Sequence, residues 1–262
     1  MKKSFLRVSI LLALLPTLSA CNSGSHIILM NSLESMSGSV QKLENITGDR
    51  LSLMFETKQS FVLYFKQQNC GLCQKVEPYF TKLVNQNNFL IHSYSNSDVH
   101  HLELRNKYPD LFDVTPKTMF IKNGELVMTL SASKYNNEKA FLNTMNEFCL
   151  KSEMYSARTS KGLDYFKENF NDYFVFVTNF DNSRTHEIFA DIVYPILSTA
   201  SSPSLIVDSK TLGETVYQNF ITEFDLDGEA KDWAFNVKNG TKKDAINYLD
   251  NIFELNEMLA KI

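Results

Sequence analysis

The chain has 262 residues, of which 44% are apolar, so it is long enough for one or two domains with ordinary hydrophobic cores. Its formal net charge is −4, and residues 21–150 carry 12 basic and 12 acidic side chains, whereas residues 151–262 carry 11 and 18. This balance gives no support to nucleic-acid binding, and four cysteines are too few for a disulfide scaffold.

The first twenty residues form a targeting segment that must be set aside before the fold is considered. It begins with basic side chains at Lys2, Lys3 and Arg7 and continues with an apolar stretch from Ile10 to Leu18. That stretch is too short to span a bilayer as a permanent helix. We therefore expect residues 1–20 to be a signal peptide.

The residues that follow indicate a lipid anchor. Leu18-Ser19-Ala20-Cys21 resembles the lipobox of bacterial lipoproteins, which implies cleavage before Cys21 and attachment of acyl chains such as palmitate to it. Ordinary secretion without a lipid is the alternative. Because the next residues are rich in Ser, Asn and Gly, we expect residues 21–38 to be a flexible tether. The globular part would then lie on the extracytoplasmic face of a bacterial membrane, held to the lipid bilayer through acylated Cys21.

Residues 39–150 alternate predicted strands with predicted helices. In chain order, we expect a strand at 40–46, a helix at 47–55, a strand at 61–65, a helix at 72–85, a strand at 89–94, a helix at 101–108, a hairpin of 119–121 and 126–130 about a turn at 122–125, and a helix at 137–148. Strands alternating with helices and ending in a hairpin favour an α/β sheet that is covered on both faces.

A dithiol, Cys70-Gly71-Leu72-Cys73, lies between the apolar strand at 61–65 and the helix that follows. At a helix start, backbone N–H groups and the helix dipole favour a thiolate, so Cys70 is the candidate nucleophile. Cys73 lies one turn later and is the candidate resolving thiol. Gly71 permits close approach, and Leu72 offers an apolar rim for a substrate.

Four features in this order resemble the thioredoxin family. They are the Cys70/Cys73 pair after a central strand, Pro78 five residues later, Pro116 before the hairpin, and the turn at 122–125. The resemblance implies a thioredoxin-like α/β fold in which Pro116 is cis and faces the dithiol. It also implies that Thr115 keeps its backbone groups free to pair with an extended substrate segment.

Three departures from the family leave the direction of electron transfer open. Thioredoxins carry Trp before the first cysteine and a buried Asp six residues before it, where this chain has Asn69 and Tyr64. Strong oxidases and isomerases carry His between the cysteines, where this chain has Leu72. The site therefore matches neither a standard reductase nor a strong oxidase.

Residues 151–262 repeat part of this pattern. At an offset of 112, Thr47 falls on Thr159, and the strand at 61–65 falls on residues 173–177. Asn182-Ser183-Arg184-Thr185 then stands where the dithiol would be. A copy without thiols cannot exchange disulfides, although it can hold a substrate or support the first copy. Chance similarity of two apolar patterns is the alternative to a repeat.

The offset falls to 87 beyond this point, where Pro116 aligns with Pro203. A loss of about 25 residues is the length of one strand-helix unit. We therefore expect the second domain, residues 151–262, to be a degenerate, minimal thioredoxin-like domain.

Other interpretations of the cysteines remain open at this stage. The Cys70–Cys73 bond could be purely structural, or two thiolates could hold Cu(I), whereas zinc lacks further ligands of suitable spacing. Cys149 is expected to be a buried free thiol. No metal site or cofactor is predicted.

Two functions follow. The first is a membrane-anchored, extracytoplasmic thiol-disulfide oxidoreductase that exchanges disulfides with exported proteins and depends on a membrane or extracytoplasmic redox partner. The second is a non-catalytic thioredoxin-fold lipoprotein that serves as a binding or accessory module for export or assembly.

Overall fold

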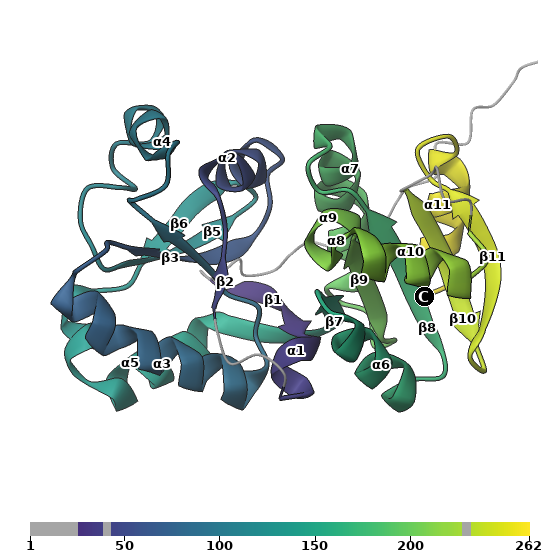
Figure 1. Cartoon of the computed structure of the whole chain (residues 1–262), viewed down its shortest axis with the longest axis horizontal. Helices are drawn as coiled ribbons and strands as arrows, with labels where there is room; N and C mark the ends of the chain where they lie inside the picture. Colours follow the sequence, from purple (N-terminus) through teal and green to yellow (C-terminus); the bar gives the residue numbers. More distant parts are fainter. Residues whose placement is uncertain (1–25, 39–42, 227–231) are drawn as a thin grey trace, which may run out of the picture.

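A computed structural model describes residues 26–38, 43–226 and 232–262, which form two α/β domains lying side by side (Figure 1). The predicted signal peptide and Cys21 lie outside the described residues. In the described parts of the chain, no helix is both long and apolar enough to cross a membrane.

The first domain has the strand order β2-β4-β3-β5-β6. Its elements are β2 (Glu44–Asn45), α2 (Gly48–Glu56), β3 (Phe61–Lys66), α3 (Gly71–Asn87), β4 (His92–Ser95), α4 (His101–Lys107), β5 (Lys117–Lys122), β6 (Glu125–Thr129), a 3-10 turn (Ala132–Asn136) and α5 (Glu138–Phe148). β2, β4 and β3 are parallel, and β5 and β6 are antiparallel to their neighbours. This is the topology of the thioredoxin fold, so the predicted fold is confirmed.

Local sequence signals explain why these elements begin where they do. Thr47 caps α2 by accepting a hydrogen bond from the N–H of Arg50, and Asn137 caps α5 in the same way. Asn123 and Gly124 both have positive φ, as a tight hairpin turn requires. Residues 61–65 are buried because α2 and α4 cover one face of the sheet and α3 and α5 the other (Figure 1).

The second domain has its own sheet, of order β1-β7-β9-β8-β10-β11, in which β1 is Ile27–Ser32. Its elements after β1 are β7 (Cys149–Ala157), α6 (Ser160–Asn169), β8 (Tyr173–Thr178), α7 (Ser183–Ile188), a π-helical turn (Phe189–Val193), α8 (Tyr194–Leu197), β9 (Ser204–Asp208), α9 (Ser209–Leu212), α10 (Glu214–Glu223), β10 (Trp233–Lys238), β11 (Thr241–Asn247) and α11 (Ile252–Leu259). From β7 onward this is the order found in the first domain.

The second domain is therefore thioredoxin-like, but it is complete and not minimal. The offset of 112 holds at Thr159, which caps α6 as Thr47 caps α2, and at β8. The alignment of Pro203 with Pro116 is wrong, because β9 is parallel to both β7 and β8 and so is the middle strand. The hairpin is instead formed by β10 and β11. A short apolar strand after a proline has the same pattern in either place, so the sequence did not distinguish them.

The predicted tether is also wrong over residues 26–38. Residues Ile27–Ser32 form β1, which pairs in parallel with β7, and Leu33–Met36 form the short helix α1. The prediction failed because serines and asparagines surround the short apolar run Ile27-Ile28-Leu29-Met30, so the composition of the whole segment was that of a tether. The predicted boundary at residue 150 likewise falls inside β7.

These N-terminal residues join the two domains. Ile27 and Leu29 are buried in the core of the first domain, whereas Leu33 is buried in the core of the second. The buried carboxylate of Glu34 accepts hydrogen bonds from the backbone N–H groups of Arg158 and Thr159, at 2.7 and 3.0 Å. These contacts place a negative charge at the start of α6, where the helix dipole favours it.

Candidate redox site

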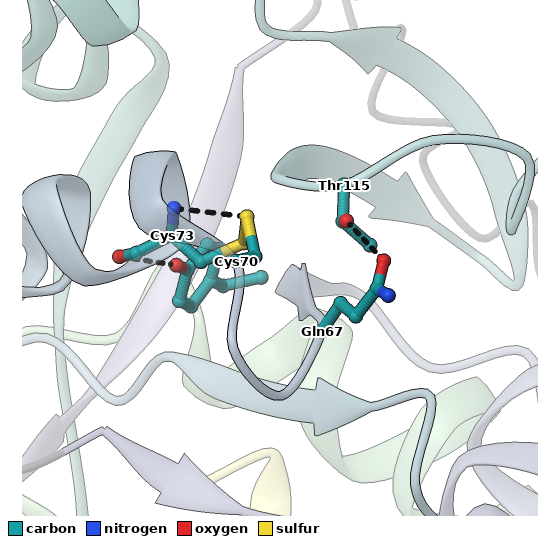
Figure 2. The surroundings of a disulfide bond; sticks show 5 residues. Gln67, Cys70, Cys73 and Thr115 are labelled. Carbon is teal, nitrogen blue, oxygen red and sulfur yellow. Dashed lines mark hydrogen bonds between the residues drawn. A yellow bond between two sulfur atoms is a disulfide. The ribbon is translucent and has the colours of Figure 1, made fainter.

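The two cysteines of the dithiol form a disulfide at the start of α3 (Figure 2). Their Cα atoms are 5.2 Å apart, and the Sγ of Cys70 accepts a hydrogen bond from the N–H of Cys73 at 3.1 Å. Cys70 is partly exposed, whereas Cys73 is only 3% exposed. The sulfur at the helix start is thus the one that another molecule can reach.

The backbone before Cys70 turns sharply from β3 into α3. Asn69 has a φ of 64°, in the left-handed region that asparagine tolerates better than most residues. The N–H of Cys70 donates to the carbonyl of Gln67, which closes the turn. The dithiol therefore lies beyond the carboxyl end of the buried strand β3, where the backbone N–H groups of α3 point toward it.

Tyr64 occupies the place where thioredoxins carry a buried carboxylate. Its hydroxyl donates to the carbonyl of Cys73 at 3.1 Å and so ties the helix to the sheet. Burial, followed by the nearby negative charge of Glu77, holds the pKa of the Tyr64 phenol well above its usual range. A neutral phenol that already donates its proton cannot act as a base toward Cys73.

The bond between Thr115 and Pro116 is cis, as the resemblance implied. β5 begins directly after it and pairs with β3, with Lys117 opposite Phe65. The Thr115 hydroxyl donates to the side-chain carbonyl of Gln67 at 3.2 Å, so this turn meets the loop that leads to Cys70 (Figure 2). Within the described residues, the backbone N–H and carbonyl of Thr115 have no hydrogen-bond partner.

Two exposed apolar side chains lie at this end of the sheet. Leu72, a predicted site residue, is 37% exposed in the first turn of α3. Val114 is 58% exposed next to Thr115 and was not predicted as a site residue. The signal that could have identified it is its position directly before the Thr115-Pro116 pair.

The corresponding end of the second domain lies next to the first domain, although Asn182, Ser183 and Arg184 are exposed. Asn182 caps α7 as Cys70 caps α3, and Thr185, in the place of Cys73, is fully buried with its hydroxyl bonded to backbone carbonyls. Arg50 of α2 lies over the Phe180 ring, at 5.0 Å from its centroid, and 3.6 Å from the carboxylate of Asp208. This end contributes to the domain interface.

The other cysteine of the described residues is not part of the site. Cys149 is free and buried, and burial raises the pKa of its thiol to about 12. Across the residues that the structure describes, no three His, Cys, Asp or Glu side chains gather in a way that could hold a metal ion.

Comparison with known proteins gives similarity in structure alone. No protein-family model matches the sequence, and no curated protein matches it. Solved structures that match include a Schistosoma mansoni thioredoxin pre-protein, with 23% identity, 41% of this chain and 98% of that chain covered, and a TM-score of 0.32. Thioredoxin f2 of Chlamydomonas reinhardtii has 19% identity, 40% and 94% coverage, and a TM-score of 0.33.

Longer matches also occur. The zinc-bound form of human ERp44 has 10% identity, 78% of this chain and 52% of that chain covered, and a TM-score of 0.33. This chain spans about half the length of that protein and of the ERdj5 fragment that it also matches. The fold assignment therefore depends on the strand order, the cis-proline and the place of the dithiol.

Proposed function

We propose that this protein is a thiol-disulfide oxidoreductase that acts on exported proteins through Cys70 and Cys73. The observation that carries the proposal is the asymmetric disulfide at the start of α3, with one sulfur accessible and the other shielded. A purely structural bond closing so short a loop contributes little stability and has no need of an accessible sulfur.

The chemistry follows from this asymmetry. In the reducing direction, the Cys70 thiolate attacks one sulfur of a substrate disulfide, and the other substrate sulfur leaves as a thiolate that takes up a proton. Cys73 then loses its proton and attacks Cys70, which releases the second substrate thiol and closes the Cys70–Cys73 disulfide. Two electrons pass to the substrate, and a redox partner must supply two more to reopen the bond. The oxidising direction is the reverse.

Thr115 supports this proposal from the opposite side of the site. Its unpaired backbone N–H and carbonyl can bond to an extended segment of the substrate, as a strand added to an edge would. Such pairing would hold the substrate sulfur in line with Cys70.

Trapping of mixed disulfides tests the function. The Cys73→Ser variant should accumulate covalent complexes with exported proteins that a reductant releases, because the resolving thiol is missing. Cys70→Ser should form none, and Cys149→Ala is the matched control because its thiol is buried elsewhere. If Cys73→Ser traps no partner, the chain is instead a binding or accessory module in which the dithiol is not used.

The direction of transfer is decided by the reduction potential of the pair. A value of about −270 mV would identify a reductase that receives electrons through the membrane, and a value of about −120 mV would identify an oxidase. Counting free thiols after equilibration in graded glutathione buffers measures this potential.

We further propose that Cys21 carries a lipid that anchors the protein on the extracytoplasmic face of a bacterial membrane. The lipobox-like sequence supports this. In that case, Cys21→Ser should move the protein from the membrane fraction to the soluble fraction, and the mass of the mature N-terminal peptide of the wild type should include acyl chains.

A further inference from the structure

A buried lysine follows the cis-proline directly. Lys117 is only 8% exposed, and lysine is rarely buried unless its ammonium group is paired. Its Nζ donates to the Oδ1 of Asp113 at 2.6 Å and to the backbone carbonyl of Asp110 at 2.5 Å. We call these three residues the Lys117 clasp. Both acceptors belong to the loop before Pro116, so the ammonium group binds that loop back onto the start of β5.

The clasp fixes the backbone that presents Val114. The Oδ1 of Asp113, which accepts the hydrogen bond from Lys117, also accepts one from the N–H of Val114 at 2.9 Å. On the inner side, Phe112 packs edge-on against Phe65, with ring centroids 5.1 Å apart. The loop is therefore held both by an ion pair and by the core, while Val114 remains exposed.

The loop that the clasp holds lies at the redox site. Lys117 is opposite Phe65 in the β3–β5 ladder, so the residues before Lys117 lie beside the loop that continues from β3 to Cys70. The hydrogen bond between Thr115 and Gln67 confirms this proximity. A segment that pairs with Thr115 would pass Val114 on its way to or from the disulfide.

We propose that the Lys117 clasp positions Val114 and Thr115 so that Cys70 reacts preferentially with extended polypeptide segments that carry an apolar side chain next to the reactive cysteine. This proposal depends on the proposed function. Lys117 is a positioning residue, because it acts through the loop, whereas Val114 is the side chain that meets the substrate.

A merely structural role for the lysine makes a different prediction. If Lys117 only stabilised β5, its loss would reduce reaction with every disulfide to the same extent. If it positions a recognition loop, its loss affects only substrates long enough to reach that loop. Glutathione disulfide, which brings no extended segment, and a disulfide-linked peptide with leucine beside its cysteine separate the two cases.

The experiment compares Lys117→Met with Lys122→Met, the same change at the far end of the same strand. For the peptide, Lys117→Met should lower kcat/KM about tenfold, mainly through KM, because the loop that orients the substrate is released. Its rate with glutathione disulfide should stay within about twofold of the wild-type rate. Val114→Ser should lower kcat/KM for the peptide alone, and Lys122→Met should change neither rate.

Several results would overturn the proposal. If Lys117→Met lowers kcat/KM equally with both disulfides, or leaves KM for the peptide unchanged, Lys117 has only a structural role. If Lys117→Met does not fold, Asp113→Ala removes the acceptor from a half-exposed position and faces the same criterion. Wild-type protein that reacts with neither disulfide would refute the proposed function itself, whereas selective failure of the peptide comparison refutes only this inference.

Discussion

Because the imidazole of His186 is buried, we expect the stability of the second domain to fall in acid. His186 lies in α7, is fully buried and packs on Phe180, with ring centroids 4.3 Å apart. Neither of its ring nitrogens has a hydrogen-bond partner among the described residues. Burial, followed by the nearby positive charge of Arg50, lowers the pKa of His186 to about 2.

The sign of the effect follows from the two protonation states. In the unfolded chain this histidine has a pKa of about 6.5, so below that pH the unfolded state binds a proton that the folded state does not. Stability is therefore lost as the pH falls from about 6.5 toward the folded pKa of His186, at about 1.4 kcal/mol per pH unit. Between pH 7.5 and 5.5 the free energy of unfolding should fall by about 1.4 kcal/mol from this group alone.

Urea unfolding of the wild type and of His186→Leu, each at pH 7.5 and 5.5, measures this difference. Trp233, the only tryptophan in the chain, lies in β10, so its fluorescence reports on the domain that holds His186. The leucine variant should lose about 1.4 kcal/mol less than the wild type over this pH range. Ile188→Val, a change without a titratable group in the same helix, is the control and should keep the wild-type dependence. If His186→Leu and the wild type respond equally to pH, the burial argument is refuted.

Three further predictions test the architecture. Removing residues 26–38 should lower the free energy of unfolding by several kcal/mol, because each buried apolar side chain contributes about 1.5–3 kcal/mol. Urea unfolding measures this change, and a flexible tether could be removed without such a loss. Tyr64→Phe should cost about 1 kcal/mol through the lost bond to Cys73, yet leave the pH dependence of thiol exchange unchanged in stopped-flow assays. Arg50→Ala should lower the urea midpoint reported by Trp233 fluorescence, because it removes the contacts of this guanidinium with the second domain.

Much of the first domain could be predicted because its signals are local. Thr47 caps a helix with its own side chain, and the run at 61–65 is apolar at every position, as a strand buried on both faces must be. Cys70 and Cys73 follow shortly after that strand, so their place at a helix start followed from the chain order. Their contrast in exposure followed from the helical turn between them.

The contacts around the cis-proline could not be predicted in the same way. The hydrogen bond between Thr115 and Gln67 joins residues 48 positions apart in the chain. It exists because β3 pairs with β5 in a register that places Lys117 opposite Phe65. Nothing in the local pattern specifies that register. For the same reason Lys117 had the pattern of an ordinary strand residue, although the structure buries its ammonium group.

The errors at residues 21–38 and at Pro203 have a common cause. The composition of a segment and the order of apolar strands along the chain do not say which strand pairs with which. β1 is a strand because β7 lies beside it, and β9 is a central strand because it lies between β7 and β8. Pairing of this kind is a tertiary property that a single sequence does not state.

The absence of thiols at residues 182–185 determines what this end of the second domain can do. Asn182, in the place of Cys70, is exposed, and Thr185, in the place of Cys73, is fully buried with its hydroxyl bonded within its own loop. Arg50 of α2 contacts the neighbouring Phe180, so the first domain packs beside this end. This end therefore has the same exposure pattern as the Cys70/Cys73 site, so its lack of thiol chemistry follows from its residue types and not from a blocked surface. The second domain therefore contacts the first through this interface and through β1, and within the described residues only the first domain has a pair of thiols placed for the proposed disulfide exchange.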